Sequence, residues 1–353
     1  MLKLEPRANP STLMSWLSPL LAVLLTAICG AVLFMAVGKD PFSSLAVFFF
    51  EPIKDLRGWS EVGVKVAPLL MISVGLAICF RAQIFNIGAE GQLVVGAIAA
   101  GAVVVYFDDE TNGGFALIGL ALVAGMVAGG FWAGITAWLR DRFNANEILV
   151  SLMLVYVAEL LLSYLVHGVL IDPDGFGFPQ SKLFSSGFLL PIIVPGTRLH
   201  LGIVLAFAAA VLGWLYLSKS FSGFKLQVGG MAPRAARYAG FSARKTLWIS
   251  MLLSGGLAGL AGASEAMGPI GQLTPTISPG YGFAAIIVAF VGRLHPIGVI
   301  FSSFIMALFY IGGELSQSRL GMPSAITGVF QGILLFSLLA CDVLIRNKLS
   351  WRN

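Results

Sequence analysis

Residues 115–139 read FALIGLALVAGMVAGGFWAGITAWL, a run of 25 residues without a charged side chain. A helix of about 20 apolar residues is long enough to cross the hydrocarbon core of a bilayer. An acidic turn, residues 108–110, precedes the run, and Arg140 and Arg142 follow it. Because cytoplasmic loops carry an excess of Lys and Arg, we interpret the run as a transmembrane helix whose basic end lies in the cytoplasm.

The composition of the whole chain agrees with this interpretation. Of its 353 residues 58% are hydrophobic and only 11% are charged, whereas about a quarter of the residues of a soluble domain are charged. So few charges cannot cover a globular surface. The 42 glycines would let helix backbones approach closely in lipid. The composition predicts an all-α, polytopic membrane protein.

Nine further apolar runs can be placed by the same criterion. They are Trp16–Gly38, Val62–Phe80, Ile87–Phe107, Ile148–His167, Leu199–Leu217, Leu247–Ala263, Gly282–Gly292, Ile297–Ile311 and Ala325–Ile345. We therefore expect about ten transmembrane helices, within a range of eight to ten. The run Gly282–Gly292 is the shortest, because about 11 residues of helix cover only about 16 Å. It predicts either a half-helix or a helix that starts earlier, near Tyr281.

The distribution of positive charge predicts the orientation. With the N-terminus in the cytoplasm and alternating sides, 15 of the 22 Lys and Arg residues fall on the cytoplasmic side. This bias explains the net charge of +5 without a nucleic-acid partner. We expect a cytoplasmic tail at 1–15, a transmembrane domain at 16–345 and a second cytoplasmic tail at 346–353, in a multi-pass protein of the cell inner (cytoplasmic) membrane.

Two loops of this layout are longer than simple turns. The outer loop, 168–197, is rich in Gly, Pro and Ser, and is either a solvated connector or a docking surface for an external partner. The inner loop, 218–246, contains six basic residues and no acid. Within it Pro233 to Gly240 has the pattern of a short helix, with Pro at the start and Gly at the end. That helix either contacts a cytoplasmic subunit, or its basic loop binds anionic lipid headgroups.

Ionisable side chains inside a span are costly and are functional candidates by default. Glu90 shares a helix face with Asn86, and Glu159 shares one with Tyr156. Each carboxylate either lines or gates a solute path, or belongs to a buried hydrogen-bonded network that fixes helix packing. The glycine spacings 125/129, 130/134 and 255/259 predict close helix contacts.

The chain contains no motif for chemistry of its own. A phosphate-binding loop needs G-x-x-x-x-G-K-[ST], and its nearest approach, Ala239 to Thr246, has Ala239 and Arg244 at the glycine positions. We find no metal-ligand cluster, no catalytic residues and no cofactor motif. Any energy from ATP must therefore come from another chain.

Several motifs resemble one family of membrane proteins. These are NIGAEGQ at 86–92, AARYAG at 235–240, SGGLAGLAG at 254–262, GYGFAAI at 280–286 and GRLHP at 292–296. Together they resemble the permease subunits of nucleoside and simple-sugar ABC importers, within the superfamily of ribose and branched-chain amino-acid permeases. The resemblance runs from about Val62 to the C-terminus. The chain departs from the family pattern at Ala232 and His295, where the family often has Asn.

The resemblance implies a complex. ABC ATPase subunits dock on the cytoplasmic side, a second permease subunit, identical or homologous, completes the pathway, and an extracytoplasmic binding protein delivers a small-molecule solute. It implies that the coupling contact to the ATPase is formed by Pro233, Arg234, Ala236, Arg237, Tyr238 and Gly240. Candidates for the lining of the solute path are Asn86, Glu90, Tyr156, Glu159, Tyr281 and Phe283. The aromatic rings would offer stacking faces to a nucleoside, and the carboxylates would bind ribose hydroxyls.

Two other functions remain open at this point. A stand-alone secondary transporter or channel would use Glu90 or Glu159 as an ion or proton carrier. An integral membrane enzyme would need His, Asp or Cys residues clustered at a membrane face, and the sequence has no such cluster.

Overall fold

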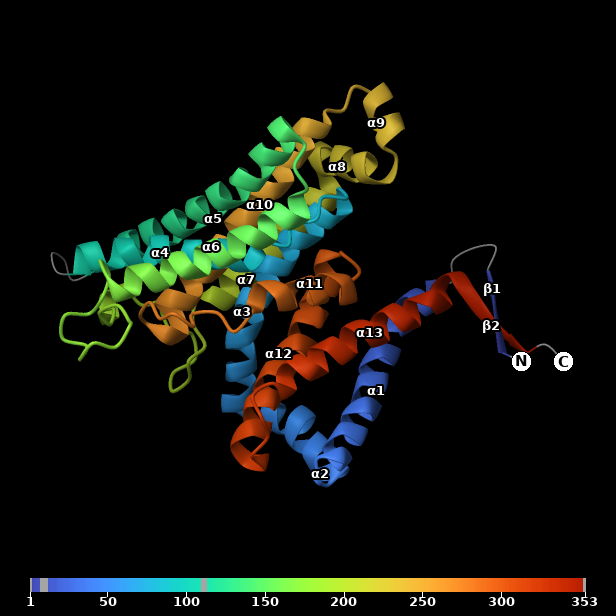
Figure 1. Ribbon diagram of the computed structural model, residues 1–353, viewed down its shortest axis with the longest axis horizontal. Helices are drawn as coiled ribbons and strands as arrows, with labels where there is room; N and C mark the ends of the chain where they lie inside the picture. The colour runs from blue at the N-terminus through green and yellow to red at the C-terminus, as the bar shows by residue number, and fades with distance from the viewer. Residues whose placement is uncertain (1, 7–11, 109–112, 352–353) are drawn as a thin grey trace. The chain divides into compact units, whose positions relative to one another are not determined.

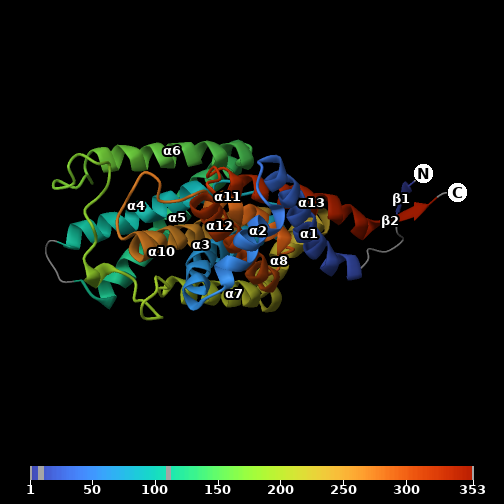
Figure 2. The same cartoon turned by 90° about the horizontal axis from the view of Figure 1, so that it is seen from below.

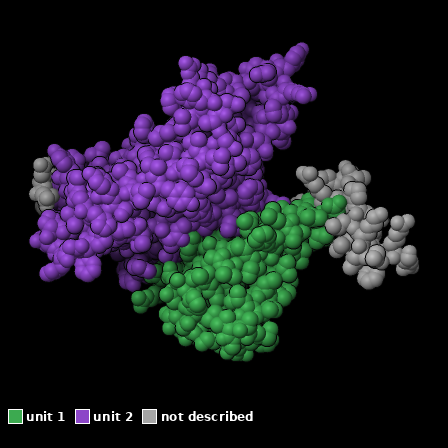
Figure 3. Space-filling view, viewed as in Figure 1, with its two compact units in different colours: residues 1–62, 305–353 green, residues 63–304 purple. Residues whose placement is uncertain are grey.

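The computed structural model describes residues 2–6, 12–108 and 113–351, most of which lie in helices (Figure 1). The chain forms two compact units, residues 1–62 with 305–353 and residues 63–304 (Figure 3). Among the described residues nine helices are long and apolar enough to cross a membrane. The predicted polytopic helical fold is thus confirmed, and the tenth predicted span is the eleven-residue helix α11.

The smaller unit consists of the two ends of the chain. Its elements are β1 (Leu2–Pro6), α1 (Thr12–Ala36), α2 (Pro41–Leu45), a π-helical turn (Ala46–Phe50), a 3₁₀ turn (Glu51–Ile53), α13 (Ile326–Arg346) and β2 (Asn347–Trp351). Helix α1 packs along α13, and the Ser18 hydroxyl donates to Asp342 at 2.5 Å. The rings of Phe48 and Phe330 stack with centroids 4.2 Å apart. The two strands pair antiparallel, so the residues predicted as separate tails are joined there.

The larger unit contains the remaining helices. They are α4 (Ala89–Asp108), α5 (Phe115–Phe143), α6 (Glu147–His167), α7 (Gly202–Lys219), α8 (Phe221–Met231), α9 (Pro233–Tyr238), α10 (Ala243–Glu265) and α11 (Tyr281–Val291). Helices α3 (Leu56–Arg81) and α12 (Pro296–Leu320) continue from one unit into the other. Polar caps set several helix starts: the Asn146 side chain accepts from Ile148 N and Leu149 N, and Ser242 accepts from Lys245 N.

Helices α4, α5 and α10 form the centre of the larger unit and lie side by side in both ribbon views (Figure 2). Glycines make their close approach possible. A Cβ atom at Gly259 would overlap the Gly125 carbonyl oxygen, and one at Gly129 would lie 2.5 Å from the Gly255 oxygen. The predicted close contacts at the 125/129 and 255/259 spacings are therefore confirmed. At Gly130 the nearest atom would be 3.4 Å away, an ordinary contact.

Two helices of the larger unit, α4 and the short helix α11, are preceded by non-helical backbone. Between α3 and α4, residues 82–88 are extended or turn-like and mostly buried. After α10 a π-helical turn, Ala266–Ile270, leads into the non-helical residues 271–280, and α11 begins only at Tyr281. The helices that follow these segments meet at their first turns, where Gly282 N at the start of α11 donates to Glu90 Oε2 at the start of α4.

The long connection 168–197 is held against the second of these breaks. Ser181 N donates to Leu273 O at 2.9 Å, and Phe184 N donates to Gly271 O at 2.8 Å. Leu190 N donates to Met267 O, also at 2.8 Å. The connection is thus a packed part of the larger unit, next to the start of the non-helical segment 271–280.

Candidate functional site

Glu90 lies in the first turn of α4 and holds the start of α11. Its side chain is 3% exposed, and its Oε2 accepts a hydrogen bond from Gly282 N at 2.5 Å. The preceding amide, Tyr281 N, donates to Ser278 Oγ at 3.2 Å. The first amides of a helix have no partner within the helix and favour a negative charge. Ser278 thus accepts from the first amide of α11 and Glu90, from α4, accepts from the second, and a Cβ at Gly282 would collide with the Glu90 backbone.

Asn86 lies just before α4 at the centre of a closed polar network. Its Nδ2 donates to Gln92 Oε1 at 2.9 Å and to Ser254 Oγ at 3.0 Å. Its Oδ1 accepts from Gly88 N at 3.1 Å and from Gln92 Nε2 at 2.9 Å. Both donors and both acceptor positions of this buried amide are occupied, so the contacts favour a packing role for Asn86.

Tyr281, the first residue of α11, faces a group of charged residues. The tyrosine is fully buried, and Lys65 Nζ lies 5.7 Å from the centroid of its ring. Glu265, at the end of α10, is 4% exposed and interacts electrostatically with Lys65, Arg198 and the Tyr281 side chain. The start of α11 is thus surrounded by two buried carboxylates, one on α4 and one on α10.

Glu265 was missed by the sequence analysis, which named Glu90 and Glu159 as the carboxylates within spans. The predicted seventh span ended at Ala263, but α10 continues to Glu265 and the π-helical turn carries the helical path on to Ile270. The available signal was the uncharged, mostly apolar segment Ala266–Ile270 after the glutamate. Asp342 was missed for a different reason, because it lies inside the predicted span Ala325–Ile345 and was not considered there.

The other three path candidates lie at the surface of this chain. Tyr156 and Phe283 are 55% and 40% exposed, and Glu159 is exposed on the same helix as Tyr156. Glu159 is close enough to Glu90 to interact with it electrostatically. The structure therefore brings Asn86, Glu90 and Tyr281 together in the interior and leaves Tyr156, Glu159 and Phe283 on outward faces of α6 and α11.

The far end of α11 is held by Arg81, the last residue of α3. Arg81 Nε donates to Leu294 O at 2.8 Å, and Arg81 Nη1 donates to Gln227 Oε1 on α8 at 2.8 Å. Gln227 Nε2 in turn donates to Leu217 O at 2.7 Å. One guanidinium thus connects α8 with the turn that follows α11.

That turn has an unusual backbone. Two successive residues without a glycine's freedom, Arg293 and Leu294, have φ values of 58° and 53°. Each such left-handed residue costs about 1–3 kcal/mol and persists only when its surroundings enforce it. The neighbouring His295 is partly buried close to Arg81, and both effects lower the pKa of its imidazole.

The basic segment 218–246 lies at one end of the larger unit, which we call the basic end. It is formed by the C-terminal ends of α5 and α7, the N-terminal end of α10, and helices α8 and α9 (Figure 1). The predicted short helix is present as α9, which starts at Pro233, and Gly240 follows it with φ of 76°. Tyr238 is 97% exposed, whereas Ala236 faces inward. An ion pair of 2.7 Å between Arg244 and Asp141 ties α10 to α5.

Nine apolar helices long enough to span a membrane among the described residues, together with the short apolar helix α11 and two buried carboxylates at its start, indicate a multi-pass membrane transport protein. The comparison with known families specifies which kind. Residues 59–339 match the family described as "Branched-chain amino acid transport system / permease component", and the chain belongs to this family of permeases.

Three relatives illustrate the family. The chain is 35% identical to the glucose ABC transporter permease protein TsgB13 of Haloferax volcanii, over 97% of this chain and 91% of the relative. It is 34% identical to the guanosine ABC transporter permease protein NupP of Bacillus subtilis, over 90% and 91%. It is 27% identical to the nucleoside ABC transporter permease protein NupB of Lactococcus lactis, over 91% of this chain and 89% of the relative. No solved structure matches the chain.

Proposed function

We propose that this chain forms the solute path of an ABC importer for neutral, polyhydroxylated solutes, namely nucleosides or related simple sugars. Separate ATPase subunits hydrolyse ATP, a second permease subunit completes the path, and an extracytoplasmic binding protein delivers the solute. The names of the relatives, which refer to glucose, guanosine and nucleoside transport, support the solute class. We place both termini and the basic end in the cytoplasm, following the charge bias of the sequence.

One observation carries the proposal: the contact between Glu90 and the start of the half-helix α11. In transporters the solute site typically lies where broken helices expose backbone amides near the middle of the membrane. A carboxylate already bound to an amide can exchange that partner for a solute hydroxyl without leaving a buried charge unpaired. Tyr281 supplies an aromatic face beside it, and Phe283, Tyr156 and Glu159 lie on surfaces that a second permease subunit would cover.

The coupling contact is proposed for α9 and the residues around it. Pro233 fixes the start of the helix, Gly240 ends it, and Ala236 anchors it on the protein. Arg234, Arg237 and Tyr238 remain exposed, as a docking surface for an ATPase requires. Movement of α8 and α9 would reach α11 through Gln227, Arg81 and the Leu294 carbonyl. The start of α11 would then shift against Glu90 and alter the access of solute.

The experiment is uptake of labelled guanosine and of labelled glucose by cells that express the complete complex. Uptake should require ATP and should be saturable for at least one of the two solutes. The double variant Arg237→Glu, Tyr238→Ala should abolish it while the complex still reaches the membrane. Lys219→Gln is the matched control, because this exposed residue of the basic segment lies outside α9. Intact uptake in the double variant would show the coupling assignment to be wrong.

The alternative of a stand-alone secondary transporter is tested with the same protein. The isolated chain in liposomes would have to accumulate solute under an ion gradient without ATP. Accumulation of that kind would replace the ABC proposal, and its absence together with ATP-driven uptake by the complex would support it.

A further inference from the structure

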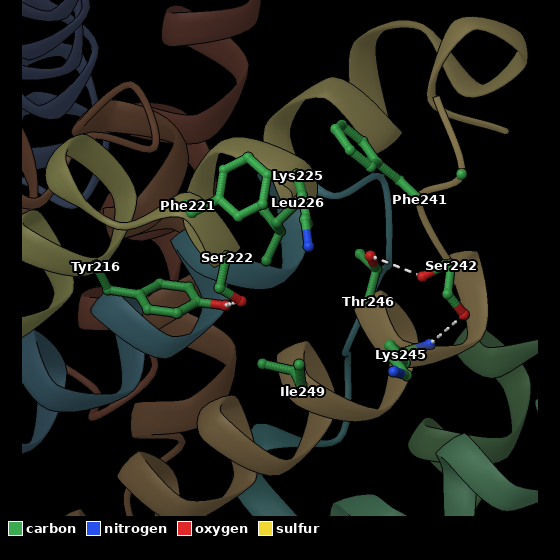
Figure 4. A pocket seen from close by; sticks show the side chains of 11 residues that line it. Tyr216, Phe221, Ser222, Lys225, Leu226, Phe241, Ser242, Lys245, Thr246 and Ile249 are labelled. Atoms are coloured by element: carbon green, nitrogen blue, oxygen red, sulfur yellow. Dashed lines mark hydrogen bonds between the residues drawn. The ribbon is translucent and has the colours of Figure 1, made fainter. Parts of the chain in front are cut away.

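A partly open pocket at the basic end contains cationic and hydroxyl groups that the proposed transport function does not use. It lies between the C-terminal end of α7, helix α8 and the first turns of α10, with a volume of about 260 Å³ (Figure 4). It is lined by Tyr216, Phe221, Ser222, Lys225, Leu226, Gly240, Phe241, Ser242, Lys245, Thr246 and Ile249. No carboxylate is among these described residues, so the lining is positive.

Lys225 is positioned by aromatic rings. Its Nζ lies 4.2 Å from the centroid of the Phe221 ring and 5.6 Å from that of Phe241. Contact with ring faces stabilises an ammonium group without neutralising it. Figure 4 shows the Lys225 amine directed into the pocket, with Thr246 and Ser222 on either side. The amine is thus held beside two rings and directed towards the pocket.

Hydroxyl groups and a second lysine complete a set of donors. The Tyr216 and Ser222 hydroxyls lie 3.0 Å apart, so one of them donates to the other and the second can donate to a ligand. At the opposite wall the Thr246 hydroxyl donates to Ser242 O, and the Ser242 hydroxyl accepts from Lys245 N and can itself donate. Lys245 lines the same pocket from the first turn of α10. Ammonium and hydroxyl donors around a small cavity suit the oxygens of a phosphate group.

Exposed apolar side chains lie on the helices that form the pocket. Phe221 and Phe224 on α8 are 65% and 54% exposed. Ile249, which lines the pocket from α10, is exposed, as are Leu212 and Leu215 in the turn of α7 that precedes Tyr216. Both α7 and α10 are among the helices that qualify as membrane spans. Exposed rings at the end of spans are typical of the level of the lipid headgroups.

We propose that this pocket binds the phosphate headgroup of an anionic phospholipid. The phosphate oxygens are held by Lys225, Lys245 and the hydroxyls, and the acyl chains lie along the exposed leucines of α7 and the start of α10. A soluble phosphate would leave the exposed Phe221 and Phe224 without a partner. A lipid covers them with its own chains, so the apolar rim favours the lipid source.

The test is lipid binding by the purified complete complex in detergent, titrated with phosphatidylglycerol or with phosphatidylcholine and followed by native mass spectrometry. We expect phosphatidylglycerol to be retained and phosphatidylcholine to be lost. Each of Lys225→Gln and Lys245→Gln should weaken retention about fivefold, and the double variant about 25-fold. Lys225→Arg, which keeps the charge, should retain the lipid, as should the matched control Lys219→Gln.

Three results would overturn the proposal. The first is equal retention of phosphatidylglycerol by the double variant and by the unchanged protein. The second is competition in which inorganic phosphate alone displaces the lipid at low concentration, which would identify a phosphate site. The third is binding only to the chain stripped of its ATPase subunits, which would show that a protein partner covers the pocket. All three readouts are independent of transport, so they separate this proposal from the proposed function.

Discussion

Replacing Arg81 by Met tests how α8 is linked to α11. The change keeps a long apolar stem at the end of α3 but removes the hydrogen bonds to Leu294 O and Gln227 Oε1, both 2.8 Å long. A hydrogen bond from a charged donor contributes about 1.5–3 kcal/mol. Coupling free energies between distant sites are of the order of 1–3 kcal/mol. Loss of the link should therefore reduce solute moved per ATP about tenfold or more.

The assay measures uptake and phosphate release in the same proteoliposomes, with the complete complex and its binding protein. We expect Arg81→Met to lower the ratio of uptake to hydrolysis while hydrolysis itself continues. Arg142→Met is the matched control, an exposed arginine at the same end of the bundle. Gln227→Leu should cause a similar loss, and the double variant should be no worse than Arg81→Met alone, because both act through one contact. A normal ratio in Arg81→Met, or fully additive losses, would refute the link.

Three further predictions concern single residues. Glu90→Gln keeps an acceptor for Gly282 N and should retain partial uptake. Glu90→Leu removes that acceptor from the start of α11 and should reduce uptake by one to two orders of magnitude, which corresponds to about 1.5–3 kcal/mol. Equal uptake by the two variants would contradict this role of Glu90. Gly259→Ala should lower the free energy of unfolding of the purified protein by about 1–3 kcal/mol, because the added Cβ overlaps the neighbouring helix α5. Gly130→Ala should be neutral or slightly stabilising, because the added Cβ has ordinary space around it. Burial lowers the pKa of His200 to about 4, against 6.5 in the unfolded chain. The buried neutral imidazole therefore contributes fully to folding stability above pH 6.5, and this stability is lost as the pH falls towards 4, by about 2 kcal/mol at pH 5. His200→Asn should flatten the fall in melting temperature between pH 7 and pH 5, and an unchanged slope would contradict this prediction.

The fold was predictable because hydropathy acts over long windows. Runs such as 115–139 identify a span whatever it packs against, and α5 covers that run. The short helix at Pro233 was predictable for a different reason, since Pro and Gly act locally on the backbone. The glycine spacing 255/259 likewise reports a contact that small residues alone permit.

The arrangement around α11 was not predictable from such signals. The hydrogen bond from Gly282 N to Glu90 joins residues 192 positions apart, and no local pattern encodes it. Glu265 escaped notice because a span boundary was drawn at Ala263, although the backbone remains helical beyond it. Arg81 was counted only as a positive charge for orientation, and the sequence gives no sign that its guanidinium reaches both Gln227 and Leu294.

The turn after α11 contains two left-handed residues without glycine, each of which costs conformational free energy. Arg293 and Leu294 together store about 2–6 kcal/mol of conformational energy, which is retained while the Leu294 carbonyl is held. The Arg81 side chain, which donates to the Leu294 carbonyl, therefore helps to hold the turn in this costly conformation. Glycine at both positions would remove this conformational cost, and the turn would then keep its shape without depending on the hydrogen bond from Arg81.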